Sequence, residues 1–195
     1  MEKFTTCTSL AAPLIRDNID TDAIIPSREM KRVSKKGLSV GLFAGWRYLD
    51  QKRRTPDPDF ILNQAIYSQS KILLSGKNFG CGSSREHAVW ALAEYGIKAI
   101  IAPSFSNIFY GNCIRNGLLP IRLDAEKISI LSKKSKALFI DLETQKVDAY
   151  PFEIEAQNKE ILLNGLDQIT MTQHHQLAID DFISKDRLVR KWAHL

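Results

Sequence analysis

The sequence predicts a layered α/β domain in which a sheet is flanked by helices. Two observations lead to this fold class. Between residues 71 and 123, apolar runs of strand length alternate with stretches of helical spacing, in the order strand, helix, strand, helix, strand. After residue 137 the pattern changes to a hairpin followed by helices. A chain of 195 residues, 44% hydrophobic and 25% charged, is long enough for one such domain.

The N-terminal residues show few regular patterns. Residues 20–26 are typical of a turn that enters a short apolar stretch. Residues 46–60 contain Pro56 and Pro58 among charged residues, and this combination predicts a loop rather than a helix or strand.

The α/β series begins with a strand at 71–75 that runs into a glycine-rich segment at 76–82. Residues 88–95 carry apolar side chains at i, i+3, i+4 and i+7, and therefore predict an amphipathic helix that ends at Gly96. A β-branched run at 97–102 predicts a second buried strand.

The series continues with a helix at 108–115, closed by Asn116 and Gly117, and a third strand at 118–123. Beyond it, residues 137–142 and 146–154 predict two strands of a hairpin.

Two helical stretches follow, at about 158–163 and 172–184. Asn164-Gly165 predicts a turn between them and no domain boundary. We therefore expect one domain over residues 1–195, with a C-terminal helical embellishment at about 157–195.

Composition excludes several classes of protein. The longest apolar runs have only a few residues, whereas a membrane helix needs about 20. The N-terminus lacks the apolar region of a signal peptide, so we expect a cytoplasmic protein. Cys7, Cys81 and Cys113 are far apart, and no histidines show the i, i+4 spacing of a metal pair. We expect this chain to bind no metal by itself.

The net charge of +5 favours anionic partners. The basic clusters of the chain lack the interleaved aromatic residues with which proteins that bind single-stranded nucleic acid stack on bases. We therefore expect no nucleic acid and no membrane among the partners, and regard most of the basic residues as solvated.

The residues with the clearest chemistry form the segment Asn-Phe-Gly-Cys-Gly-Ser-Ser-Arg-Glu-His-Ala at 78–88. It places two hydroxyls and an arginine at a helix start, where free N–H groups favour an anion. The pattern fits neither a P-loop nor a dinucleotide fingerprint. A capping box between Ser83 and Glu86 is an alternative, but it leaves unexplained why Arg85 lies where a cation opposes the helix dipole.

This segment resembles the motif of the swivelling domain in the aconitase family, in the form seen in isopropylmalate dehydratase small subunits. The resemblance implies a β/β/α architecture. It extends over nearly the whole chain except about the last ten residues, through the segments 20–26, 58–60, 62–63, 102–105, 108–109, 117–120 and 164–167, together with Asn112.

The resemblance implies roles for three motif residues. Ser83 would act as an alkoxide base that removes a carbon-bound proton, stabilised by helix N–H groups and a neighbouring cation. Ser84 would assist it. Arg85 would bind a substrate carboxylate with its planar fork.

Other residues would support the site. Arg16 lies four residues before Asp20, which reproduces the spacing of a second substrate-binding arginine in the family; the alternative is an exposed loop cation. Asp20 is expected to orient Arg16 and the loop through hydrogen bonds. Glu86 and His87 are expected to support the motif residues rather than to transfer protons.

In the family, substrate selectivity resides in a loop that corresponds to residues 27–30. Ser27, Arg28 and Met30 are therefore candidate substrate contacts. Related dehydratases often have apolar or aromatic residues here. We expect Met30 to supply an apolar contact, with Arg28 and Glu29 turned to solvent.

By resemblance, the chain would be the small part of a two-chain hydro-lyase of leucine biosynthesis. It would bind no cofactor itself, because a large iron–sulfur subunit would hold the [4Fe-4S] cluster that acts on the departing hydroxyl. The substrate would be a small hydroxy diacid, 2-isopropylmalate, isomerised through 2-isopropylmaleate. Homoaconitate or a methylmalate-type acid remains an alternative substrate. A nucleic-acid-binding module and a stand-alone anion-binding domain remain alternatives from other classes.

Overall fold

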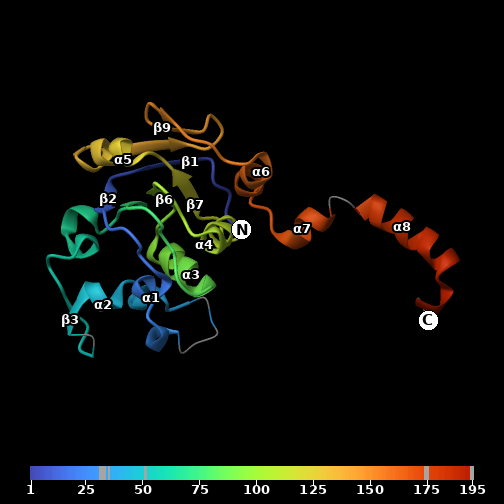
Figure 1. Cartoon of the computed structure of the whole chain (residues 1–195), viewed down its shortest axis with the longest axis horizontal. Coiled ribbons are helices and arrows are strands. Elements are labelled where there is room, and N and C mark those ends of the chain that lie inside the picture. Colours follow the sequence, from blue (N-terminus) through green and yellow to red (C-terminus); the bar gives the residue numbers. More distant parts are fainter. Residues whose placement is uncertain (31–33, 35, 51, 174–175, 194–195) are drawn as a thin grey trace. The chain divides into compact units, whose positions relative to one another are not determined.

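A computed structural model of the chain describes residues 1–30, 34, 36–50, 52–173 and 176–193 (Figure 1). The chain divides into two compact units, Met1–Gly165 and Leu166–Leu195. The expectation of one domain with a C-terminal embellishment stays a prediction.

The first unit is built around a four-stranded parallel sheet in the order β2-β5-β6-β7. Its strands are β2 (Ala11–Leu14), β5 (Ile72–Ser75), β6 (Ala99–Ala102) and β7 (Leu119–Arg122). Every residue of β5 and β6 is buried, as expected for parallel strands covered on both faces. The three predicted strands of the α/β series are therefore confirmed. β2, which contains Pro13, was not predicted, but proline is tolerated on an edge strand.

A second, antiparallel sheet has the order β1-β8-β9-β10. Its strands are β1 (Thr6–Ser9), β8 (Leu138–Asp141), β9 (Lys146–Val147) and β10 (Tyr150–Pro151). Ile140 pairs with Val147, which confirms the predicted hairpin. The predicted second strand is shorter than expected, because the chain folds back after Val147 and continues as β10.

The predicted loop at 46–60 is wrong in part. The segment contains the end of α2 (Ala44–Arg47) and a hairpin of β3 (Tyr48–Asp50) and β4 (Thr55–Pro56). Pro56 forms the end of a two-residue strand, where it pairs with Tyr48 at the edge. The prolines therefore shorten the strands without preventing the hairpin.

Helices surround these sheets and also form the second unit. The α-helices of the first unit besides α2 are α1 (Thr21–Ile24), α3 (Glu86–Tyr95), α4 (Asn107–Arg115), α5 (Ala125–Ser132) and α6 (Ala156–Asn164). Those of the second unit are α7 (Gln168–Gln173) and α8 (Gln176–Val189). Short 3₁₀ helices are η1 (Ser27–Glu29), η2 (Ser39–Gly41), η3 (Ile61–Asn63), η4 (Ala65–Tyr67) and η5 (Lys191–Ala193). Within the described residues, no helix has both the length and the apolarity that crossing a membrane requires.

The helix predictions are confirmed at 88–95 and 108–115, where Gly96 and Asn116 are the C-caps. The predicted helix at 158–163 lies inside α6. The stretch predicted at 172–184 begins at the end of α7 and continues in α8, and its residues 174–175 lie outside the described part. The turn predicted at 20–26 contains α1.

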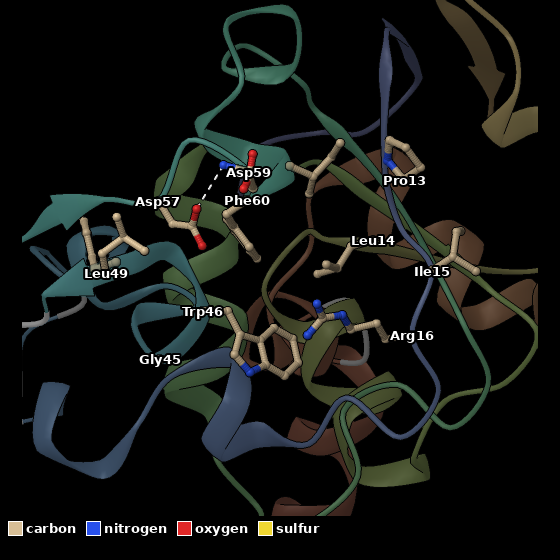
Figure 2. Close-up of a pocket in the computed structure, with 12 residues that line it drawn as sticks. Pro13, Leu14, Ile15, Arg16, Gly45, Trp46, Leu49, Asp57, Asp59 and Phe60 are labelled. Atoms are coloured by element: carbon tan, nitrogen blue, oxygen red, sulfur yellow. Dashed lines mark hydrogen bonds between the residues drawn. The ribbon is translucent and has the colours of Figure 1, made fainter.

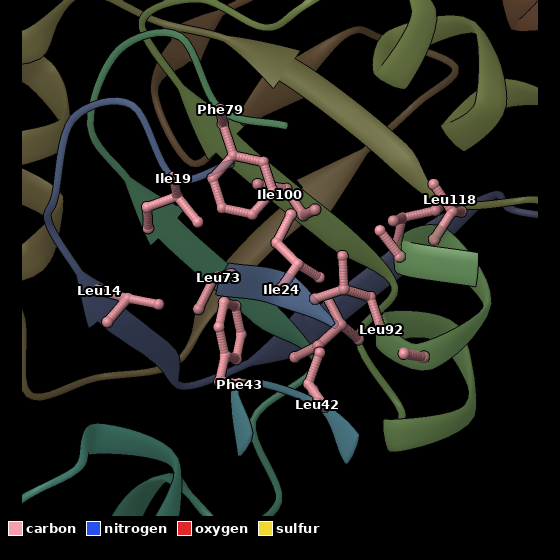
Figure 3. Packing of buried hydrophobic residues seen from close by; sticks show 14 of the residues in the cluster. Leu14, Ile19, Ile24, Leu42, Phe43, Leu73, Phe79, Leu92, Ile100 and Leu118 are labelled. Carbon is pink, nitrogen blue, oxygen red and sulfur yellow. The ribbon is translucent and has the colours of Figure 1, made fainter. Parts of the chain in front are cut away.

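Successive side chains along the parallel strands point to opposite faces of the sheet, and each face packs in its own hydrophobic core. Leu73 and Ile100 face a cluster with Leu92 of α3 (Figure 3). Ile72 and Ile101 face a second cluster, which includes residues of α5 and of the antiparallel sheet. Burying each such side chain stabilises the fold by about 1.5–3 kcal/mol. The order of layers is thus helices, parallel sheet, antiparallel sheet with α5, which confirms the β/β/α architecture.

The loops that follow β2, β5 and β6 meet at one edge of the parallel sheet, because the carboxyl ends of parallel strands lie together. Backbone hydrogen bonds join them. Gly80 N donates to Ile19 O at 2.7 Å, and Phe79 N donates to Ser104 O at 3.0 Å. The glycine-rich segment is therefore held between the loops of two neighbouring strands.

We expect Gly80→Ala to lower the free energy of unfolding by about 2–4 kcal/mol. Gly80 has a φ of +73°, and an added Cβ would lie 2.1 Å from Cγ of Phe109. Urea denaturation measures the change. Gly45→Ala is the matched control, because its Cβ would meet nothing within 4 Å. Equal stabilities of the two variants would contradict this role of Gly80.

Candidate active site

The motif loop leads into α3, whose N-cap residue is Arg85. The N-cap of α3 is Arg85 rather than Ser83, and its side chain makes no capping hydrogen bond, so the alternative of a capping box between Ser83 and Glu86 is wrong. Glu86 instead accepts a hydrogen bond from Asn116 Nδ2 at 2.6 Å on its Oε1. Ala88 N donates to the carbonyl of Arg85 at 3.2 Å, so the N–H groups of Glu86 and His87 are the ones in the first turn that an anion could bind.

The backbone around Ser83 is clamped by the segment that contains α1. Thr21 Oγ1 donates to the carbonyl of Ser83 at 2.9 Å, and Thr21 N donates to the carbonyl of Cys81 at 2.9 Å. Gly82 has a φ of +88°, and an added Cβ would lie 3.3 Å from Cβ of Asp20. Glycine thus allows the close approach that fixes the loop.

Ser83 and Ser84 are exposed residues on this fixed loop. They belong to a narrow niche at the start of α3. The niche is lined by Thr21, Gly80, Gly82, Ser83, Ser84, Arg85, Ser106, Ile108, Phe109 and Asn112. The structure therefore brings together the three motif residues that the sequence singled out.

Arg85 is held by a partner that the sequence analysis did not assign to it. Its Nη1 donates to Oδ1 of Asp22, and the Arg85 side chain is only 17% exposed. The hydrogen bond from Arg85 lowers the pKa of Asp22, and a hydrogen bond from Ser27 acts in the same direction. Asp22 engages one N–H group of a guanidinium that carries five, so an incoming carboxylate can still bind.

Asp20 is the N-cap of α1, where its Oδ1 accepts a hydrogen bond from Ala23 N at 2.6 Å. The expected hydrogen-bonding role of Asp20 in the turn is confirmed. Its effect on Arg16 stays a prediction.

Arg16 lies in a different hollow from Ser83. Its guanidinium is 4.8 Å from the ring centre of Trp46, in a cleft with a volume of about 740 Å³. Figure 2 shows Arg16 along Trp46 on one side of this cleft, with Asp57 and Asp59 on the other. The substrate-binding role of Arg16 stays a prediction.

The candidate selectivity loop begins as η1 and continues to Met30. Ser27 Oγ donates to Asp22 at 3.1 Å, so the loop touches the partner of Arg85. The Arg28 side chain is 49% exposed. Glu29 is only 12% exposed and bonds Arg54, so the expectation that it turns to solvent is wrong. Met30 packs against the first core cluster, and its substrate contact stays a prediction.

His87 contacts an aromatic ring, and Cys81 and Cys113 are affected by burial. The His87 ring lies 4.7 Å from the ring of Trp90. Burial raises the pKa of the Cys113 thiol well above its usual value. Burial also raises the pKa of Cys81, and the charge of Asp20 adds to this effect. Across the part of the chain that the structure describes, no three His, Cys, Asp or Glu side chains gather as metal ligands would.

Several known proteins are similar to this chain over nearly its whole length. Residues 1–126 match the family model of the aconitase C-terminal domain. The small subunit of 3-isopropylmalate dehydratase from Cupriavidus necator is 52% identical, with 100% of this chain and 99% of that protein covered. The corresponding subunit from Agrobacterium fabrum is 47% identical, with 99% of this chain and 100% of that protein covered.

A solved structure agrees with these relatives. The crystal structure of a 3-isopropylmalate dehydratase from Methanocaldococcus jannaschii superposes with a TM-score of 0.67 at 29% identity. The match covers 90% of this chain and 98% of that chain. The chain therefore belongs to the aconitase C-terminal domain family, among the small subunits of 3-isopropylmalate dehydratase.

Proposed function

We propose that the chain works with a larger subunit to isomerise 2-isopropylmalate and 3-isopropylmalate through 2-isopropylmaleate. The names of its relatives support this place in leucine biosynthesis. The observation that carries the proposal is one arrangement of side chains. Ser83 and Ser84 lie exposed at the start of α3, beside an arginine that Asp22 holds.

In the proposed reaction, Ser83 removes the proton from the carbon next to the one that bears the hydroxyl. The C–H electrons form the double bond as the hydroxyl leaves. Hydration reverses these steps with water added at the other carbon, and Ser83 returns the proton. A serine hydroxyl is a weak acid, so its alkoxide needs stabilisation by the N–H groups of α3 and by the charge of Arg85.

Arg85 is proposed to bind one carboxylate of the substrate, with Ser84 as a further hydrogen-bond donor. Arg16 is proposed to take the second carboxylate. This assignment is supported by the loops of Arg16 and Arg85, which follow neighbouring parallel strands, β2 and β5. Ser27, Arg28 and Met30 would meet the alkyl substituent.

Three further residues are proposed to support the site rather than to react. Asp20 caps α1, and thereby steadies the segment that clamps the motif loop. Glu86 anchors the start of α3 to Asn116. His87 packs its ring beside Trp90.

The proposed chemistry requires a partner chain. Ser83 is an exposed residue, whereas an alkoxide base needs a site from which water is largely excluded. A larger subunit that covers the start of α3 would supply this enclosure. The free thiols lie apart on β1, on the motif loop and on α4, so the donor set of the described residues does not suit a [4Fe-4S] cluster. We assign the cluster to the larger subunit, where it would act as a Lewis acid on the departing hydroxyl.

We expect Ser83→Ala to lower kcat of the two-chain enzyme by at least about a hundredfold, because the base is lost. The hydration of 2-isopropylmaleate, followed by ultraviolet absorbance without oxygen, measures the rate. Ser129→Ala, at an exposed position on α5, is the control and should leave kcat unchanged. Size-exclusion chromatography should show that both variants still bind the large subunit. Wild-type turnover by Ser83→Ala would refute the assignment of the base.

We expect Arg85→Lys to raise KM for 2-isopropylmaleate by about 10- to 100-fold, because an ammonium group cannot reproduce the fork of the guanidinium. Steady-state kinetics of the two-chain enzyme measures this change. Arg53→Lys is the control, since the Arg53 side chain is 86% exposed on the β3–β4 turn. An unchanged KM for Arg85→Lys would remove Arg85 from the carboxylate-binding role.

A further inference from the structure

Glu29 differs from Arg28, the other charged residue of the 27–30 loop, because its side chain is largely buried. Its side chain is 12% exposed, and its Oε2 lies 2.5 Å from Nη2 of Arg54. Arg28, its neighbour, approaches the same carboxylate at 3.5 Å but is 49% exposed. A carboxylate so far removed from water needs a close cation, and Arg54 is the closer of the two.

Arg54 is held in place by contacts of its own. Its guanidinium lies 5.1 Å from the ring centre of Tyr48 and donates to the carbonyl of Val40 at 3.4 Å. Its backbone has a φ of +55°, a left-handed conformation that is unfavourable for a residue with a side chain. The ion pair to Glu29 and the ring contact offset this cost, so the β3–β4 hairpin presents Arg54 to η1.

Gly41 packs directly against the Glu29 side chain. A Cβ at position 41 would lie 2.7 Å from Cβ and 3.0 Å from Cγ of Glu29. The first of these atoms cannot swing away without movement of the backbone of η1. Position 41 therefore needs glycine for Glu29 to reach Arg54.

The other end of η1 touches the candidate site. Ser27 donates to Asp22 at 3.1 Å, and Asp22 bonds Arg85. The 3₁₀ helix thus has one anchor at Arg54 and one at the partner of Arg85. Since η1 is only three residues long, a shift at Glu29 changes the position of Ser27.

We infer that Glu29 and Arg54 are a positioning pair, which sets η1 against Asp22 and thereby fixes how Arg85 meets a substrate carboxylate. This inference rests on the proposed function. A contact made equally to substrate and transition state changes KM more than kcat. Breaking the pair therefore weakens substrate binding without removing the base.

The test uses Arg54→Gln and Gly41→Ala, which disturb the pair from two directions, in the two-chain enzyme. Each variant should raise KM for 2-isopropylmaleate by about tenfold and leave kcat within about twofold. Arg54→Lys, which keeps the charge, should recover part of the affinity. In the free chain, hydrogen exchange should become faster at the amides of Glu29 and Met30 in Arg54→Gln and Gly41→Ala, because these amides close η1.

Lys134→Gln is the matched control. It breaks an ion pair of 2.8 Å between Lys134 and Asp148, whose side chains are 38% and 24% exposed. This variant should change neither KM nor the exchange of η1. If Arg54→Gln and Gly41→Ala lower only the melting temperature, as any structural change could, the inference fails. If the wild-type two-chain enzyme is inactive, the proposed function fails. Hydrogen exchange then tests the inference separately: unchanged exchange of the η1 amides in Arg54→Gln and Gly41→Ala would refute the positioning role of Glu29 and Arg54.

Discussion

The candidate site depends on the clamp between the segment of α1 and the motif loop. Thr21 fixes the backbone of Ser83 from one side, and Asp22 holds the guanidinium of Arg85 from the same short helix. The loop after β2 thus fixes the proposed base and the neighbouring cation, which both lie on the loop after the adjacent strand β5. The clamp fixes the positions of these groups, but Ser83 stays exposed to solvent. Under the proposed function, a closed and reactive site would need a second surface, and this is the physical argument for a two-chain enzyme.

Much of the fold could be predicted because its central strands are unbroken apolar runs and its helices have clear caps. The strand at 72–75 and the helix ended by Gly96 are examples. Short edge elements could not be predicted. Pro13 in β2 and Pro56 in β4 argue against a strand in isolation, and only pairing with neighbouring strands makes these segments extended. Strand pairing between distant segments is a tertiary effect that local patterns do not contain.

The same distinction applies to the site. Ser83, Ser84 and Arg85 could be identified because they are contiguous and chemically specific. The role of Asp22 could not, because its partner is 63 residues away in the chain. For Glu29, a charged residue in a loop predicts exposure, whereas Arg54 reaches it across 25 residues through a hairpin that the sequence did not predict. Long-range ion pairs therefore account for what the sequence missed at this site.

The measurement that most directly tests the account is hydration of 2-isopropylmaleate by the chain alone and by the chain mixed with an iron–sulfur-reconstituted large subunit. Loss of ultraviolet absorbance under anaerobic conditions reports the reaction. Hydration is expected in the mixture and not by the chain alone, because Ser83, the proposed base, is exposed in the isolated chain. Equal hydration by the isolated chain, or no hydration by a mixture with intact cluster and complex, would contradict it.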